Sequence, residues 1–327
     1  MRVLVIGGTG NISTAIVREL IKKKNDVSVL NRGTREVEGA TQIIADRNNR
    51  EAFLKAVENK KFDCVIDMIC YHENDARTLC EAFAGKTKQI IFCSTVDVYK
   101  KPAACYPVTE DAVLEADPAF EYAWHKVECE KVMQQEAKKG SFALTVVRPA
   151  ATYGDHSTPI SLVGDGRGLM HRIKTGKPLI VIGDGSSLWT SAHRDDVGRA
   201  IANAVGNPKA MNNSYTLASG EAITWEQYYR TVAEAMDAPT PDIVGIHWRE
   251  LVQAGRGACD WSGFNFRFNN VFDCTRAKED LDFRITVTWK EGAKRLVRYH
   301  ENQGDIDAKY EDPNYDRILA EVKGSRV

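Results

Sequence analysis

The chain has 327 residues, of which 43% are apolar and 27% are charged, and its formal net charge is −1 at pH 7. This length allows a large buried core in one or two domains, and the composition is ordinary for a folded globular protein. A net charge near zero provides no general field that would recruit nucleic acid or an anionic membrane, so we expect neither as a partner.

The eight cysteines are scattered along the chain and form no CxxC pair. This pattern is typical of free thiols in a reducing cytoplasm, and it predicts neither a disulfide framework nor a metal site. Only Met1 precedes the first predicted strand, and no apolar run reaches the length of about 18 residues that a membrane helix needs. We therefore expect a cytoplasmic protein.

The N-terminal part of the chain alternates short apolar, β-branched runs with segments of helical spacing. The strand-like runs are 2–6, 26–30, 41–45, 64–69, 89–94 and 144–149. Such alternation predicts parallel βαβ units whose strands are buried on both faces. Residues 1–150 should therefore form a Rossmann-type doubly wound parallel sheet of six or more strands.

After Pro149 the alternation loosens into glycine-rich stretches, a short strand and amphipathic helices. We expect a smaller C-terminal α+β substrate domain built from residues 151–192 and 213–300. Residues 193–212 are expected to pack back onto the first domain, and the charged residues 301–327 to form a peripheral tail.

The first predicted strand leads through the loop GGTGNIS, residues 7–13, into a predicted helix. Gly7 would allow the tight turn, and Gly10 would let the backbone approach a pyrophosphate at the helix N-terminus. Ser13 stands where a third glycine usually permits close packing of helix and sheet, and serine is a small replacement. Taken alone, the loop fits either a dinucleotide or a plain turn.

The end of the second strand indicates which dinucleotide is preferred. Asn31 stands where an acidic residue would bind the ribose hydroxyls of NAD, and Arg32 and Arg35 follow it. Because an arginine can hold a 2′-phosphate through two parallel bonds, we expect NADP, with NAD possible. Asp46, after the third strand, is a candidate partner for the adenine amino group.

Tyr122 and Lys126 lie four residues apart on a predicted helix and so share one face. An adjacent ammonium and an oxidised nicotinamide would stabilise the phenolate and lower the pKa of Tyr122. Tyr122 could then exchange a proton with a substrate oxygen during hydride transfer. Hydroxyls in the run FCSTVDVY, residues 92–99, are expected at the ligand-binding edge of the sheet.

At this point the chain resembles the extended short-chain dehydrogenase/reductases of the NAD(P)-dependent epimerase/dehydratase family, over roughly residues 1–295. Six motifs carry the resemblance in the family's order: GGTGNIS, FCSTVDVY, PVTED (107–111), YAWHK (122–126), RPAATYG (148–154) and HRDDVGRA (193–200).

The resemblance implies that Thr95 is the catalytic hydroxyl, Tyr122 the acid/base, and Lys126 the residue that lowers its pKa and holds the nicotinamide ribose. Asp97 is either an additional acid/base group or a turn cap. The candidate cofactor-binding residues are Gly7, Thr9, Gly10, Asn11, Ile12, Asn31, Arg32, Asp46, Arg47, Met68, Ser94, Tyr122, Lys126 and Pro149.

Two departures from the family's pattern concern the substrate. Val96-Asp97 follows Thr95 where nucleotide-sugar dehydratases carry consecutive Asp-Glu. Trp189 stands where nucleotide-sugar epimerases keep an arginine for the diphosphate, and an indole cannot supply a cationic fork. A nucleotide sugar is therefore disfavoured unless Arg167, Arg172 or Arg267 compensates, and Trp189 is a candidate substrate contact.

The resulting prediction is an NAD(P)-dependent oxidoreductase or epimerase that acts on a secondary alcohol or ketone of a sugar-like small molecule. One alternative is a nucleotide-sugar epimerase or dehydratase. Another is a non-catalytic NADP-binding sensor or an RNA-binding relative, because LNRGT (30–34) also resembles chloroplast RNA-binding members of the superfamily. The resemblance further implies a homodimer through helices at 73–85 and 120–139, with Ala76, Leu79, Phe83 and Val127 on their exposed faces.

Overall fold

The computed structural model describes residues 1–324 of the chain and divides it into two compact units. Unit 1 consists of residues 1–152, 194–218 and 272–286, and unit 2 of the remaining residues, 153–193, 219–271 and 287–327. The chain therefore leaves unit 1 and returns to it twice. The second return, by residues 272–286, lies within the segment that we expected to belong to the substrate domain.

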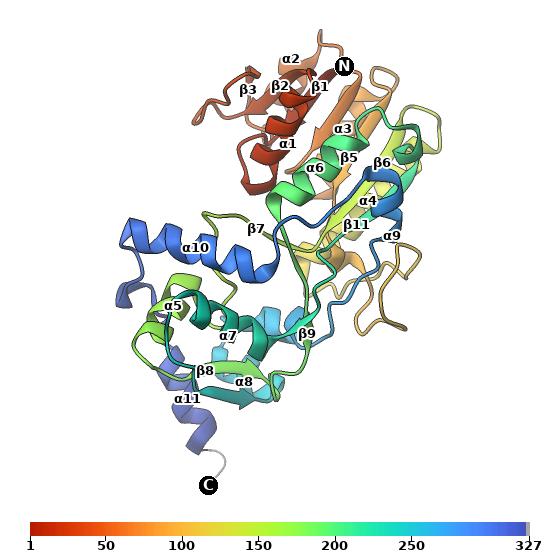
Figure 1. Ribbon diagram of the computed structural model, residues 1–327. Coiled ribbons are helices and arrows are strands. Elements are labelled where there is room, and N and C mark those ends of the chain that lie inside the picture. The colour runs from red at the N-terminus through yellow and green to blue at the C-terminus, as the bar shows by residue number, and fades with distance from the viewer. Residues whose placement is uncertain (325–327) are drawn as a thin grey trace. The chain divides into compact units, whose positions relative to one another are not determined.

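Unit 1 is built on a seven-stranded sheet with the order β11-β6-β5-β4-β1-β2-β3, in which every pairing is parallel (Figure 1). The strands are β1 (Arg2–Ile6), β2 (Asp26–Asn31), β3 (Thr41–Ile44), β4 (Cys64–Asp67), β5 (Gln89–Cys93), β6 (Ala143–Pro149) and β11 (Asn213–Leu217). The Rossmann-type parallel sheet is thus confirmed. The seventh strand, β11, was not predicted.

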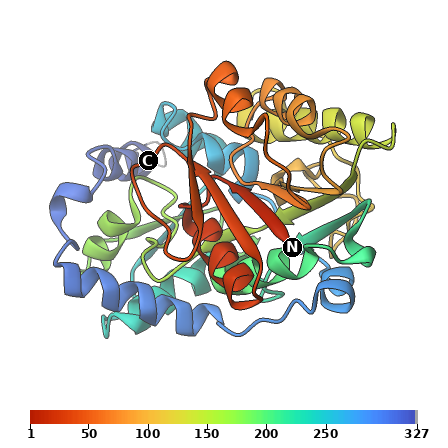
Figure 2. The same ribbon diagram turned by 90° about the horizontal axis from the view of Figure 1, so that it is seen from above.

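Helices cover both faces of this sheet. Helix α1 (Asn11–Lys22) packs against α6 (Arg194–Ala204), and α6 packs against α9 (Thr275–Leu281). On the other face α2 (Arg50–Val57), α3 (Glu73–Phe83) and α4 (Glu121–Ala137) close over a core that includes Phe53, Phe83 and Met133. Figure 2 shows these two helical layers on opposite sides of β1 and β2.

The residues that we expected on a dimer surface of α3 and α4 are buried in the structure instead. Ala76, Leu79, Phe83 and Val127 are all at most 4% exposed. The expectation that they lie on exposed faces was wrong, because both helices turn their apolar sides toward the sheet and toward each other.

Unit 2 is made of helices and short strand pairs. Strand β8 (Leu179–Ile182) pairs in parallel with β13 (Ile243–Ile246), and β9 (Leu188–Trp189) pairs antiparallel with β12 (Ile223–Thr224). The helices are α5 (Gly166–Lys174), α7 (Trp225–Ala235), α8 (Trp248–Gly255), α10 (Trp289–Gln303) and α11 (Tyr315–Gly324). Strand β10 (Ser191–His193) also belongs to unit 2, and β7 (Ala151–Tyr153) spans the point in the chain at which unit 1 ends and unit 2 begins. No helix within residues 1–324 has the length and apolar character needed to cross a membrane.

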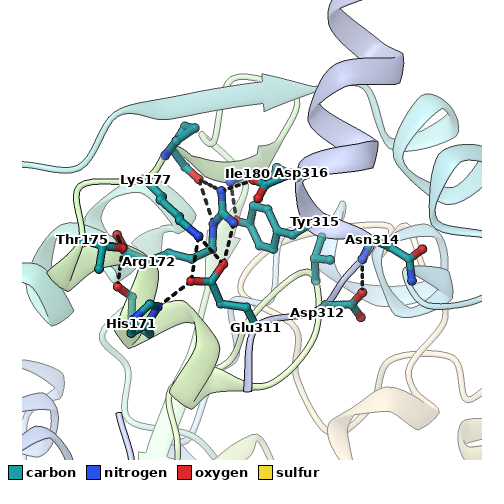
Figure 3. A network of polar contacts seen from close by, with 12 residues as sticks. His171, Arg172, Thr175, Lys177, Ile180, Glu311, Asp312, Asn314, Tyr315 and Asp316 are labelled. Carbon is teal, nitrogen blue, oxygen red and sulfur yellow. Dashed lines mark hydrogen bonds and ion pairs between the residues drawn. The ribbon is translucent and has the colours of Figure 1, made fainter. Parts of the chain in front are cut away.

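The C-terminal residues are joined to unit 2 through the buried side chain of Arg172 (Figure 3). Its guanidinium contacts Glu311 at 3.0 Å and Asp316 at 2.8 Å, and it lies over the ring of Tyr315. His171 and Lys177 also contact the Glu311 carboxylate, at 2.5 and 3.0 Å. Since Tyr315 and Ile318 are at most 2% exposed, residues 301–324 are an integral part of unit 2 and not the peripheral tail that we expected.

This network makes the stability of unit 2 depend on pH. Burial alone would raise the pKa of Glu311, but hydrogen bonds from His171 and Lys177 and the nearby cations lower it below its ordinary value. A lowered folded-state pKa means that the stabilisation is complete above the unfolded-state value and is lost as the pH falls through the folded-state value.

We therefore expect Glu311→Gln to unfold more easily than wild type at neutral pH and to lose less stability between about pH 6 and about pH 3. Urea titrations followed by circular dichroism across this range measure the effect. Glu301→Gln, which removes an exposed glutamate of α10, should follow the wild-type curve. If the free energies of unfolding of wild type and Glu311→Gln fell equally as the pH was lowered, this assignment would be contradicted.

Candidate active site

The candidate site lies at the carboxyl edge of the unit 1 sheet. The chain places β2 and β3 on one side of β1 and β4 on its other side, so the strand order reverses next to β1. Ligands of doubly wound sheets bind at this reversal, outside the carboxyl ends of the strands. The segments that follow β1, β4 and β5 meet there and supply most of the expected site residues.

The loop after β1 has the geometry of a phosphate-binding turn. Gly7 adopts a φ of +82°, and a Cβ atom at this position would lie 2.6 Å from the Ile69 side chain, so only glycine fits. Gly10 is the N-cap of α1 and supplies no side-chain cap to the first amides of the helix. Ser13 is buried in α1 at the packing position. The loop therefore leaves helix amides available for an anion.

The segment after β5 folds into a short 3-10 helix, η1 (Val96–Val98), that is capped by Thr95. Thr95 Oγ1 accepts a hydrogen bond from the Asp97 backbone amide at 3.2 Å and donates one to Asp97 Oδ2 at 3.3 Å. The other carboxylate oxygen of Asp97, Oδ1, lies 2.7 Å from Lys101 Nζ. Thr95 is therefore the cap of this turn, and Asp97, within the turn, presents a buried carboxylate paired with Lys101 at the site.

Tyr122, in the first turn of α4, belongs to the same cluster as Thr95 and Asp97. Burial and then the Asp97 carboxylate are the main causes that raise the pKa of the Tyr122 phenol, while a hydrogen bond with Thr95 opposes them. Smaller contributions that raise it come from Cys93 and Tyr71. The protein's own groups thus favour the protonated phenol form of Tyr122.

Lys126 lies one helical turn after Tyr122 and is only 2% exposed. Its Nζ donates hydrogen bonds to the backbone carbonyls of Cys70, at 2.9 Å, and Cys93, at 2.7 Å. We expected Lys126 together with an oxidised nicotinamide to lower the pKa of Tyr122; among the protein's own groups, burial and the Asp97 carboxylate raise it. The ammonium is held by the segments after β4 and at the end of β5, and the burial and charge effects at Tyr122 prevail.

A buried ion pair fixes the helix that carries Tyr122 and Lys126. Arg148, on β6, contacts Glu130, on α4, through two parallel hydrogen bonds of 3.0 and 2.7 Å. Burial alone would lower the pKa of Arg148, but the hydrogen bonds and charge of Glu130 raise it above its ordinary value. Arg148 also donates to the Tyr99 hydroxyl at 3.1 Å, which in turn hydrogen bonds to Thr216 at 2.7 Å.

The sequence motifs include the residues of this hydrogen-bond network, but they do not reveal their roles. Arg148 opens RPAATYG and Glu110 lies in PVTED, whereas Glu130 follows Lys126 by one further turn. Glu110 accepts a hydrogen bond from the backbone amide of Thr216 at 2.8 Å. The one available signal was the presence of charged residues in otherwise apolar motifs, because unpaired charges are rarely buried.

The expected adenosine contacts are arranged as follows. The Asn31 side chain closes the turn after β2, accepting from the Gly33 amide at 2.8 Å and donating to the Arg35 carbonyl at 3.3 Å. Arg32 is exposed in this turn and takes part in none of the ion pairs found among residues 1–324. Asp46 is exposed after β3, where it accepts from the Asn48 amide at 2.9 Å.

Arg47 and Met68 are buried in the interior of unit 1. Arg47 is 4% exposed, and its guanidinium contacts Asp67 at 3.1 Å and the Asp75 carbonyl at 2.6 Å. The structure thus uses the Arg47 charge to neutralise a buried carboxylate, which differs from the cofactor contact that we expected. Met68 is buried directly after β4, and its amide extends the pairing with Ile6.

The other candidate residues lie along the same edge. Thr9 is half-buried and Asn11 exposed at the start of α1, where Asn11 Nδ2 donates to the Thr152 carbonyl at 3.1 Å. Ile12 is half-buried, and Pro149 is the last residue of β6. Ser94 Oγ is buried without a hydrogen-bond partner within residues 1–324. This orphaned hydroxyl and the uncapped glycine loop fit a bound dinucleotide.

Trp189 lies in unit 2 and is part of an aromatic core. It is 4% exposed, stacks on Trp225 with ring centroids 4.8 Å apart, and meets Phe266 edge to face. As a buried packing residue it does not have the open position that we expected of a substrate contact.

Of the three arginines considered for a diphosphate, two are already paired. Arg167 contacts Asp165, and Arg172 contacts Glu311 and Asp316. Arg267 lies over the rings of Trp248 and Phe268, and no ion pair within residues 1–324 includes it. Burial and then the nearby charge of Arg249 lower the pKa of Arg267.

Comparison with known proteins connects these observations to a family. A family model described as the NAD dependent epimerase/dehydratase family matches residues 3–218. The 2′-dehydrokanamycin reductase of Streptomyces kanamyceticus is 31% identical over 279 residues, which cover 84% of this chain and 77% of that protein.

Two further comparisons broaden the picture. The chloroplast stem-loop binding protein of 41 kDa b of Arabidopsis thaliana is 26% identical over 336 residues, covering 98% of this chain and 84% of that protein. The crystal structure of the UDP-glucose 4-epimerase of Thermotoga maritima with UDP-glucose has a TM-score of 0.73 at 21% identity, covering 93% of this chain and 99% of that one. This structural likeness supports the fold.

The buried pair of Arg148 and Glu130 yields a test of how the site is held. We expect Glu130→Ala to lower the free energy of unfolding by about 3–5 kcal/mol, because it leaves a buried guanidinium without its counter-charge. Chemical denaturation measures this loss. Glu81→Ala, which breaks the exposed Arg50–Glu81 pair, should cost less than about 1 kcal/mol. Equal losses in the two variants would contradict the role given to the buried pair.

Proposed function

The chain belongs to the NAD dependent epimerase/dehydratase family and is an NAD-dependent enzyme, and from this premise we propose how its own residues act. The proposed reaction is a reversible hydride transfer at a secondary alcohol or ketone of a sugar-like substrate. The observation that carries it is the convergence of Thr95, Asp97 and Tyr122, with Lys126 one helical turn after Tyr122, at the sheet edge that also carries the glycine loop.

In this proposal each residue has a separate task. A nicotinamide dinucleotide, when bound, supplies or accepts the hydride. Tyr122 donates a proton to the substrate oxygen in the reducing direction and takes it back in the oxidising direction. Thr95 hydrogen bonds to the same oxygen, and Lys126, held by the Cys70 and Cys93 carbonyls, orients the ribose of the dinucleotide.

Net reduction of a ketone is favoured over epimerisation. The relative at 31% identity is a 2′-dehydrokanamycin reductase. Asp97 is paired with Lys101, and no second acidic residue adjoins it as in the dehydratases.

The nucleotide-sugar alternative depends on a different set of contacts. With Trp189 buried and Arg167 and Arg172 paired, a diphosphate would have to use Arg267 and its neighbour Arg249. Titration with UDP separates the two substrate classes, because only a nucleotide-sugar enzyme should bind it.

A second function of another kind is RNA binding, since the chain is 26% identical to a chloroplast stem-loop binding protein over nearly its whole length. The net charge of −1 argues against a strong electrostatic contribution to RNA affinity. Fluorescence anisotropy with a stem-loop RNA over a salt series tests this function independently of turnover.

Three finer points belong to the same proposal: a preference for NADP, a cytoplasmic location, and a homodimer. Exposed Arg32 and the missing acidic residue at position 31 support NADP. Association through the outer faces of α3 and α4 would involve polar residues such as Arg77 and Lys131, since the apolar residues of both helices are buried.

The proposed reaction is tested with NADPH and NADH on a panel containing 2′-dehydrokanamycin, UDP-glucose and UDP-galactose. We expect Tyr122→Phe to lower kcat by about 10²–10⁴-fold, because general acid/base catalysis is lost, while the affinity for the dinucleotide is retained. Tyr106→Phe removes another exposed phenol of unit 1 and should match wild type. Wild-type turnover by Tyr122→Phe would contradict the assigned mechanism.

Cofactor preference is tested by fluorescence titration of NADPH and NADH. Loss of one charge-assisted contact should make Arg32→Ala bind NADPH about tenfold more weakly, with NADH unaffected. Arg77→Ala, an exposed arginine of α3, is the matched control. A wild-type preference for NADH would overturn the NADP proposal.

A further inference from the structure

Lys101 is a charged residue beside the proposed active site for which the sequence suggested no role. It lies after η1, and its Nζ is 2.7 Å from Asp97 Oδ1. The two side chains are 12% and 10% exposed, so water screens this pair only weakly. Its neighbour Lys100, in contrast, is about half exposed and pairs with the exposed Glu115.

Asp97 acts on Tyr122 in two ways. Its negative charge opposes ionisation of the phenol and is the largest cause of the raised pKa after burial. It also competes for the hydroxyl hydrogen of Thr95, which is donated to Asp97 Oδ2 at 3.3 Å. Since a hydroxyl has one hydrogen, Thr95 cannot donate fully to Asp97 and to the Tyr122 oxygen at the same time.

We propose that Lys101 is a positioning residue for proton transfer at Tyr122. By neutralising Asp97 and occupying its Oδ1 atom, Lys101 weakens the repulsion between the carboxylate and the phenolate. It also makes Asp97 a poorer acceptor for the Thr95 hydroxyl, which leaves that hydrogen available to Tyr122 or to a substrate oxygen. The inference rests on the proposed function insofar as Tyr122 is the proton-transfer residue.

The other titratable groups around Tyr122 do not duplicate this role. Cys93, at the end of β5, and Tyr71, after β4, both raise the pKa of the phenol. Lys126, on α4 itself, is engaged by two backbone carbonyls. Lys101 Nζ, by contrast, contacts the Asp97 carboxylate directly.

The rate at which N-acetylimidazole acetylates Tyr122 reports the effect without any substrate, because the reagent reacts with the phenolate. Peptide mass mapping measures this rate at fixed pH, with Tyr106, which is 40% exposed, as the internal reference in each sample. Removal of Lys101 should leave the Asp97 charge unopposed. We expect Lys101→Met to slow acetylation of Tyr122 by about tenfold, a change equivalent to one pKa unit.

Companion variants make the test specific. Asp97→Asn should accelerate acetylation by about tenfold, and Lys101→Met added to Asp97→Asn should change nothing further, because Lys101 acts through Asp97. Lys101→Arg, which keeps the charge, and Lys100→Met, which removes the neighbouring lysine, should both behave like wild type. Lys101→Gln replaces Lys101→Met if the latter fails to fold.

The proposal is overturned if loss of the Lys101 charge leaves the acetylation rate unchanged or faster. It is equally overturned if the loss slows acetylation as much in the Asp97→Asn background as in wild type. Failure of the proposed function is seen in a different experiment, because it would appear as wild-type turnover by Tyr122→Phe. Acetylation rates do not depend on turnover, so the two failures can be distinguished.

Discussion

The arrangement of the site depends on the buried ion pair between Arg148 and Glu130. Arg148 is fixed in β6 and Glu130 in α4, so two parallel hydrogen bonds set both the rotation and the height of the helix against the sheet. Tyr122 and Lys126 lie on the same helix, about two turns and one turn before Glu130. A rotation of α4 that moved Tyr122 away from Thr95 would separate a buried guanidinium from its carboxylate, at a cost of several kcal/mol.

The same pair extends its constraint to the other half of the site. Arg148 donates to the Tyr99 hydroxyl, and Tyr99 directly follows η1, which carries Asp97. Thr216, on the edge strand β11, completes the chain of contacts. Helix α4 and the turn after β5 are therefore both held by the side chain of Arg148. This explains why the hydroxyl of Thr95 and the phenol of Tyr122 can meet although they come from segments far apart in sequence.

Much of this arrangement could be predicted from local patterns. The strands of unit 1 were predictable because apolar β-branched runs recur between amphipathic helices, and parallel order then brings Gly7, Thr95 and Asn31 to one edge of the sheet. Strand β11 was not predicted because its sequence, NSYTL, has few apolar residues. It becomes a strand through pairing with β6.

The errors concern side chains whose role depends on distant partners. Arg47 follows a strand, as a cofactor ligand would, but it faces the buried Asp67. Ala76 and Val127 have the spacing of an apolar helix face, and spacing alone does not distinguish a face that packs on the sheet from one that packs on another subunit. The sequence shows that Trp189 cannot replace an arginine at this position, but only its stacking on Trp225 shows that it belongs to an aromatic core.

The electrostatics at Tyr122 show why sequence spacing cannot supply a mechanism by itself. Lysine four residues after tyrosine suggests a phenol that ionises easily, yet the Lys126 ammonium is directed at two carbonyls, and a buried carboxylate adjoins the phenol. The ionisation of Tyr122 thus depends on two interactions of Asp97. Its carboxylate repels the Tyr122 phenolate, and it attracts the Lys101 ammonium. A cation that acts on the phenol only through the carboxylate shifts its ionisation without competing for the substrate oxygen.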